Sequence, residues 1–156
     1  MSREVAQELY LRWLQDVWGG DAPTIRKSIE ELVTPDFVGH WPEREVNGAG
    51  ELTEWWTKGV SFFDDLTATL VLGPIIDGDL ISARWLMSGR YAGGLPDAGA
   101  PLGKLIRVYH TDILRLRDGK VAELWANSDQ VEGLKQLEAA GYNGCQWFLQ
   151  ENAAGS

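Results

Sequence analysis

The chain has 156 residues, a formal net charge of −9, one cysteine and eight tryptophans, and its length fits one domain that buries roughly two-thirds of its unfolded surface. The acidic balance argues against nucleic acid and anionic membranes as partners, because both attract clustered Lys and Arg side chains. No apolar run reaches the length of a signal peptide or a membrane span, so we expect a cytoplasmic protein without a membrane partner.

The first part of the sequence predicts three helices. Apolar residues recur at spacings of three and four over residues 5–17, and Gly19-Gly20 is a stop signal. Residues 21–33 predict a second helix with a proline in its first turn, where the missing N–H costs nothing. An extended segment over residues 37–42 precedes a third amphipathic helix over residues 51–60.

The second part of the sequence predicts two β-hairpins, a helix and a tail. Alternating apolar and polar residues around short Asp/Gly turns are typical of antiparallel strands. The predicted strands are residues 66–76, 80–91, 106–117 and 120–129, and they are followed by a helix over residues 130–140 and a tail over residues 141–156 that contains Cys145 and Trp147. We therefore expect one α+β domain over residues 1–140, in which a cone-shaped, curved antiparallel or mixed sheet wraps around three N-terminal helices.

The predicted strand over residues 106–117 contains the most informative pattern. Its alternation places His110 and Asp112 on the same face as Ile106, Val108, Leu114 and Leu116. The opposite face is already supplied with arginines and other polar residues, so two ionisable groups point toward the core. A buried carboxylate raises its pKa or finds a hydrogen-bond donor, and a pocket at this place follows.

The register of the last hairpin decides which residues face Asp112, since a slip of one residue exchanges the two faces of a strand. A two-residue turn at Asp118-Gly119 places Trp125, Asn127 and Asp129 beside His110 and Asp112. A three-residue loop with a bulge at Gly119 places Leu124, Ala126 and Ser128 there instead. We favour the three-residue loop and expect the second set to line the pocket.

This order of elements resembles the nuclear-transport-factor-two-like superfamily and, within it, the SnoaL-like polyketide cyclase family. The resemblance rests on the run Asp112-Ile-Leu-Arg-Leu-Arg-Asp-Gly-Lys-Val-Ala-Glu-Leu-Trp125, supported by Phe37-Val-Gly-His-Trp-Pro42 and Ile81-Ser-Ala-Arg-Trp-Leu-Met-Ser-Gly89. It covers about residues 4–138. The resemblance implies a hydrophobic ligand inside the cone and a homodimer formed through the outer face of the sheet, but it does not fix the reaction.

Three catalytic patterns of the superfamily are each incomplete here. The acid of the cyclases, one residue after the tryptophan of the last strand, is replaced by Ala126. The Arg-x-Asp of the limonene epoxide hydrolases is matched by Arg84-Trp-Leu86, which keeps only the arginine. In the ketosteroid isomerases a carboxyl of the oxyanion hole corresponds to Asp112, whereas the tyrosine and the base correspond to Trp13 and Trp41.

We expect a cofactor-independent enzyme without a metal, which acts on a small hydrophobic, oxygenated, polyketide-like molecule by acid/base chemistry such as aldol ring closure or isomerisation. His110 is expected to be the base, and Asp112, protonated or paired with Arg84, the donor or orienting group. The alternation over residues 80–88 leaves the face of Arg84 open, and its pairing with Asp112 requires that it points inward. The expected substrate-binding residues are Arg84, Trp13, Trp41, Trp56, Leu86, Leu124, Ala126 and Ser128. Two alternatives stay open: an epoxide hydrolase, and a protein that binds a hydrophobic metabolite without converting it.

Overall fold

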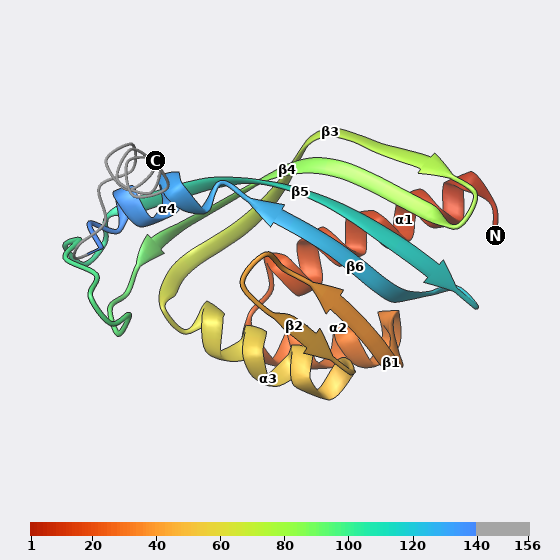
Figure 1. The fold of residues 1–156 in the computed structure, drawn as a ribbon, viewed down its shortest axis with the longest axis horizontal. Coiled ribbons are helices and arrows are strands. Elements are labelled where there is room, and N and C mark those ends of the chain that lie inside the picture. Colours follow the sequence, from red (N-terminus) through yellow and green to blue (C-terminus); the bar gives the residue numbers. More distant parts are fainter. Residues whose placement is uncertain (140–156) are drawn as a thin grey trace, which may run out of the picture.

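The computed structural model describes residues 1–139 and has the α+β architecture that the sequence predicts (Figure 1). The predicted tail, with Cys145 and Trp147, lies outside the described residues. In chain order the elements are α1 (Arg3–Arg12), η1 (Trp13–Trp18), α2 (Ala22–Leu32), β1 (Val33–His40), β2 (Glu45–Asn47), α3 (Ala49–Val60), β3 (Phe63–Asp77), β4 (Leu80–Tyr91), β5 (Leu105–Arg117), β6 (Lys120–Ser128) and α4 (Gln130–Gln136).

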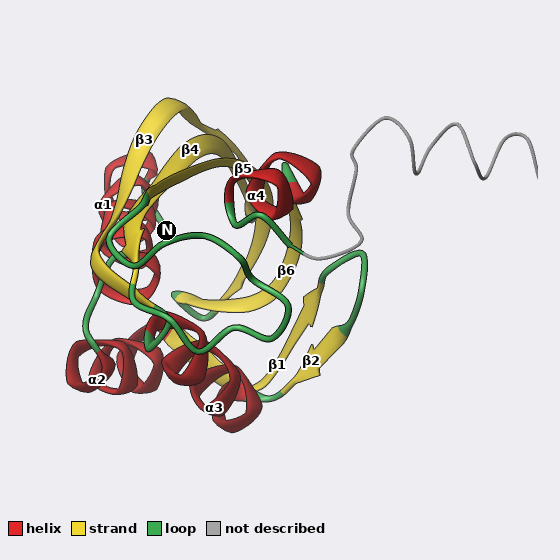
Figure 2. Cartoon of the chain, turned by 90° about the vertical axis from the view of Figure 1, so that its left-hand side faces the viewer, coloured by secondary structure: helices red, strands yellow, loops and turns green. Residues whose placement is uncertain are grey.

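The six strands form one curved, mixed sheet in the order β2-β1-β6-β5-β4-β3. All neighbours are antiparallel except β1 and β6, which are parallel. Figure 1 shows the long strands β3 to β6 curving over α1, and Figure 2 shows α1, α2 and α3 along one side of the curved sheet. The concave face and the helices enclose the main apolar core, which includes Ile25, Phe37, Leu52, Ile81 and Leu114.

The first predicted helix divides into two parts. It begins as an α-helix that Ser2 caps and continues as the π-helix η1, whose last turn ends where the Gly19 N–H donates to the Leu14 carbonyl at 2.9 Å. The wider π turn buries Trp13 and Trp18 together, and such turns are frequent at functional sites. None of the helices within residues 1–139 has both the length and the apolar character to cross a membrane.

The register of the β5–β6 hairpin agrees with the favoured alternative, but the local geometry differs from the prediction. The turn has two residues, Asp118 and Gly119, both at positive φ (51° and 76°), which is the geometry of a type I′ turn. The extra residue is Ala122 and not Gly119. Leu116 pairs with Val121 and Arg115 pairs with Glu123, so Ala122 between them has no partner on β5. The shift places Leu124, Ala126 and Ser128 opposite Leu114, Asp112 and His110.

The helix α4 and the connection between β4 and β5 lie at one end of the sheet. Both ends of the Gln136 amide hold α4 against β5, since its Oε1 accepts from the Arg107 N–H (2.7 Å) and its Nε2 donates to the Arg107 carbonyl (2.8 Å). The connection between β4 and β5 joins the same end through backbone bonds from Gly99 and Ala100 to residues that follow α4. This end of the sheet therefore has a second wall opposite its concave face.

The two faces of β5 predict opposite responses to truncation. Leu114 is fully buried, whereas its neighbour Ile113 is 42% exposed on the outer face. We expect Leu114→Ala to lower the free energy of unfolding by about 2–5 kcal/mol, because it leaves a cavity in the core. Ile113→Ala should lower it by less than about 1 kcal/mol. Urea denaturation of both variants measures the difference, and equal losses would contradict this register.

Candidate active site

The side chains of His110 and Asp112 lie on the concave face of β5 and border a chamber of about 180 Å³. The remaining walls come from η1, α3, β4, β6 and the connection between β1 and β2. Most of these walls are aromatic: five tryptophans line the chamber, namely Trp18, Trp41, Trp55, Trp56 and Trp85. A largely apolar hollow that contains a few convergent polar groups is the usual form of a small-molecule site.

Asp112 is an almost fully buried carboxylate with two hydrogen-bond donors. The Tyr10 hydroxyl donates to its Oδ1 at 2.8 Å, and the Trp85 Nε1 donates to its Oδ2 at 3.3 Å. Burial raises the pKa of the Asp112 carboxyl to about 6, although both hydrogen bonds favour its charged form. Asp112 is therefore ionised at neutral pH, and it is more basic than an ordinary carboxylate.

His110 stacks on the ring of Trp85, with 4.2 Å between the ring centroids and 12° between the ring planes. Its Nε2 is buried and has no hydrogen-bond partner among the described residues. Burial lowers the pKa of the His110 imidazole to about 4, so the ring is neutral at pH 7. A neutral imidazole has one N–H donor and one acceptor nitrogen.

The sequence analysis missed two residues that organise this site, Trp85 and Tyr10. Trp85 contacts both ionisable groups at once, and the alternation of Ile81, Ala83 and Trp85 on one face of β4 contained the signal. Tyr10 is fully buried on α1, and burial followed by the charge of Asp112 raises its pKa far above the ordinary value. Its phenol therefore keeps its proton and remains a donor.

The resemblance placed Trp13 where the isomerases have their tyrosine, but the tyrosine that contacts Asp112 here is Tyr10. Tyr10 lies one helical turn before Trp13, and its hydroxyl reaches Asp112. Trp13 is fully buried below the chamber with its ring edge against Trp18, 5.4 Å between centroids. The Trp13 Nε1 has no hydrogen-bond partner among the described residues. The nearness of the Trp13 side chain to the Asp112 carboxyl nevertheless favours the charged form of that carboxyl. Trp13 is thus part of the core and does not line the chamber.

Two of the expected substrate-binding residues lie on the wrong face of the sheet. Ala83 is opposite Asp112, so the alternation of β4 directs Arg84 and Leu86 to the outer face. The Arg84 guanidinium is exposed and lies 4.5 Å from the ring centroid of Tyr109. The partnership of Arg84 with Asp112 is therefore not formed. The expected substrate-binding residues that do line the chamber are Trp41, Trp56, Leu124, Ala126 and Ser128.

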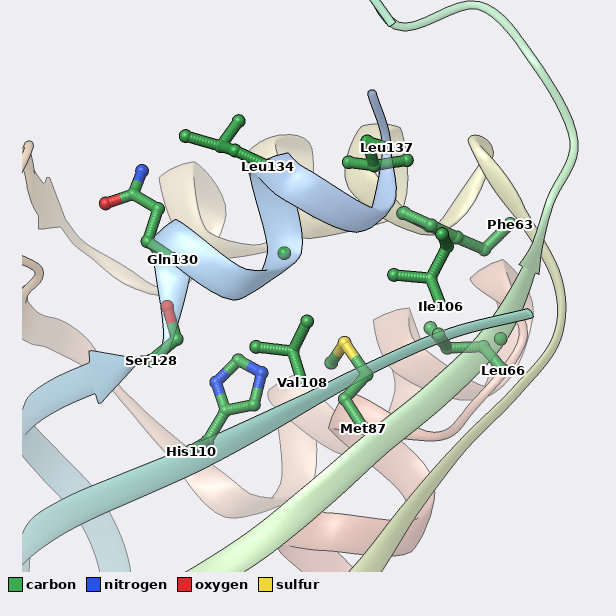
Figure 3. Close-up of a pocket in the computed structure, with 12 residues that line it drawn as sticks. Phe63, Leu66, Met87, Ile106, Val108, His110, Ser128, Gln130, Leu134 and Leu137 are labelled. Atoms are coloured by element: carbon green, nitrogen blue, oxygen red, sulfur yellow. The ribbon is translucent and has the colours of Figure 1, made fainter. Parts of the chain in front are cut away.

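A second chamber of about 210 Å³ adjoins the first and shares Met87, His110 and Ser128 with it. Figure 3 shows His110 at one end of this space, with Leu134 and Leu137 on the side opposite the sheet. The other lining side chains from β3, β4 and β5 are apolar. His110 thus lies between a chamber with a buried carboxylate and a chamber with almost no polar group.

Among residues 1–139, no group of three or more His, Cys, Asp or Glu side chains has the arrangement to hold a metal ion.

Comparisons with known proteins agree with the resemblance seen in the sequence. A family model described as SnoaL-like polyketide cyclase matches residues 8–137. The structure of TsrD from Streptomyces laurentii is 26% identical with a TM-score of 0.72, covering 88% of this chain and 97% of its own. IdmH, a candidate polyketide cyclase from Streptomyces antibioticus, is 26% identical with a TM-score of 0.68, covering 84% and 96%. A candidate SnoaL-like cyclase from Jannaschia sp. CCS1 is 22% identical with a TM-score of 0.75, covering 89% and 96%, and shows the shared fold. The comparison with curated proteins gave no match.

The two ionisable groups affect the pH dependence of stability in opposite directions. The folded-state pKa of Asp112 is raised from 3.8 to about 6, so its contribution to the free energy of unfolding falls as the pH rises through that interval. The folded-state pKa of His110 is lowered from 6.5 to about 4, so its contribution falls as the pH decreases through that interval. In the wild type the two slopes oppose each other.

We therefore expect each substitution to reveal the slope of the other group. As the pH increases from 4 to 6.5, the unfolding free energy of Asp112→Asn minus that of the wild type should rise by on the order of 2 kcal/mol. The same difference for His110→Phe should fall by a similar amount. Urea denaturation at a series of pH values measures both changes. Differences of the same sign in the two variants would contradict these pKa shifts.

Proposed function

This chain belongs to the SnoaL-like polyketide cyclase family, and we propose that it catalyses proton transfer beside a carbonyl group of a hydrophobic, oxygenated, polyketide-like substrate. The reaction would be an intramolecular aldol ring closure or a related isomerisation. The observation that carries the proposal is the buried pair of Asp112 and His110 at one aromatic chamber, with their pKa values shifted past each other, so that Asp112 becomes the stronger base. Perturbed titratable groups in a hollow of this kind are typical of acid/base sites.

The pKa shifts favour the opposite assignment of roles from the one expected from the sequence. With a pKa of about 6, the Asp112 carboxylate is a stronger base than the His110 imidazole with a pKa of about 4. A carboxylate offers about four lone-pair sites, so two remain after the donors from Tyr10 and Trp85. We therefore assign the base to Asp112 and the hydrogen-bond donor to His110.

In the proposed reaction, a carboxylate oxygen of Asp112 removes the proton from the carbon beside the substrate carbonyl. The electron pair of that C–H bond moves to the carbonyl oxygen, and the N–H of neutral His110 stabilises the enolate that forms. The enolate carbon then attacks a second carbonyl of the same molecule, which forms the new C–C bond. Asp112 returns the proton to the resulting alkoxide, so the atoms balance without a cofactor.

The second chamber supports a hydrophobic substrate that extends past the reacting carbonyl. Its walls include Ile106, Val108, Leu134 and Leu137, and it meets the first chamber at His110. Burial of an apolar substrate portion there is favourable by roughly 25 cal/mol per Å² of apolar surface removed from water. That portion would hold the reacting carbonyl beside the imidazole, which is the positioning that a proton-transfer reaction needs.

Two observations favour a second candidate function, binding without turnover. Both carboxylate oxygens of Asp112 already accept hydrogen bonds, and Ala126 stands where the cyclases have their acid. Epoxide hydrolysis has less support, because Arg84 lies on the outer face and Leu86 replaces its acidic partner.

The expected homodimer remains a prediction, for which apolar side chains exposed on β3 and β5, such as Leu72, Ile75 and Ile113, offer a surface.

Proton exchange tests the proposal without knowledge of the natural product. Incubation in D2O with a panel of polyketide-like β-diketones should incorporate deuterium beside the carbonyl, measured by NMR. Asp112→Asn should slow this exchange at least ~100-fold, and His110→Ala should also slow it by about that factor. The wild-type rate should rise with pH and reach a plateau above about pH 6, as Asp112 ionises.

Arg84→Ala is the matched control, since this side chain lies on the outer face of β4 and should not affect the exchange. Ligand binding with no exchange in any compound of the panel would favour the binding protein. Equal exchange rates in the wild type and in both site variants would remove the assignment of Asp112 and His110.

A further inference from the structure

The five tryptophans of the first chamber form a continuous aromatic wall. The centroids of neighbouring rings are 4.6 to 6.2 Å apart, and the rings of four of the five contacting pairs are tilted or edge-on to each other. In a tilted arrangement not every ring face is covered by its neighbour. The face of an indole ring carries partial negative charge, so a wall of this kind attracts cations.

The charges that line the chamber have the same sign. Two carboxylates contact it, the buried Asp112 and the exposed Glu43 near its opening. No Lys or Arg side chain lines it in the part of the chain that the structure describes. The net charge of −9 extends this preference to the surroundings, since a protein field of one sign concentrates small ions of the opposite sign.

Arg44 makes a cation–π contact with one ring of this wall. Arg44 follows Glu43 in the sequence, yet it is not among the residues that line the chamber. Its guanidinium carbon lies 5.3 Å from the ring centroid of Trp55, and it pairs with Glu51 at 3.6 Å. One ring of the wall therefore already carries a protein cation. The chamber itself has aromatic faces and a buried carboxylate but no positive group from the described residues.

We propose that the first chamber binds an organic cation, namely a quaternary ammonium or protonated tertiary amine group carried by the ligand. Alkyl groups on nitrogen contact the indole rings and need no hydrogen-bond acceptors, whereas a primary ammonium has three N–H donors to satisfy. The carboxylate of Asp112 supplies the countercharge, and one of its two remaining lone-pair sites can accept the single N–H of a protonated tertiary amine. The proposal rests on the proposed function only in taking this chamber as the ligand site.

Choline and its neutral carbon analogue 3,3-dimethylbutan-1-ol test the proposal, because they differ at one atom and in charge. Isothermal titration of the full chain at constant ionic strength measures both dissociation constants. We expect choline to bind at least tenfold more tightly than the alcohol. Equal affinities, tighter binding of the alcohol, or no binding of choline at millimolar concentration would overturn the proposal.

Two variants and one control identify the groups involved. Asp112→Asn keeps the shape of the side chain and should reduce the preference for choline to about twofold or less. Trp55→Leu should weaken choline binding about tenfold while the protein remains folded by circular dichroism. Trp125→Leu is the control, because Trp125 lies away from the chamber and stacks on His40 at 5.5 Å. If Trp125→Leu weakens choline binding as much as Trp55→Leu does, the chamber is not the site.

The two proposals can fail separately. Preferential choline binding without deuterium exchange would leave the cation site in place and remove the catalytic function. Exchange that depends on Asp112, together with equal binding of choline and the alcohol, would do the reverse.

Discussion

The site depends on one interaction, a carboxylate held inside an aromatic core by an O–H and an N–H donor. Asp112 could not remain charged in such surroundings without these donors, because an unpaired buried charge is too costly. The Tyr10 hydroxyl reaches it from a helix 102 positions earlier in the sequence, and Trp85 reaches it from the adjacent strand. The curved sheet and the first helix must therefore both be in place before the site exists, which couples folding of the domain to its chemistry.

Most of the fold could be predicted from the sequence, because side-chain periodicity is a local property. The two hairpins, the three N-terminal helices and the inward direction of His110 and Asp112 all followed from spacing. The register of β6 was also predicted, although the extra residue was placed at Gly119 instead of Ala122. The alternation along β4 left the direction of Arg84 open, and only the pairing of Ala83 with Asp112 resolves it.

Contacts between distant elements could not be predicted in this way. Nothing in the spacing of α1 distinguishes Tyr10 from Trp13 as the partner of a strand residue, since both belong to the same apolar stripe. The π-helical turn η1 rotates Trp13 and Trp18 relative to an ideal α-helix, and a 3.6-residue period does not show it. The roles of Asp112 and His110 likewise depend on how deeply each is buried, which only the assembled chamber determines.

The additional residue at Ala122 has a consequence for how this scaffold can diversify. If Ala122 were instead paired opposite Arg115, without the bulge, the distal half of β6 would turn over, so that Trp125 and Asn127 would replace Ala126 and Ser128 inside. The hollow would become smaller and would gain an amide, while β5 stayed unchanged. A change of pairing at one position of a hairpin thus exchanges one interior for another, which is a shorter path to a different hollow than rebuilding the walls residue by residue.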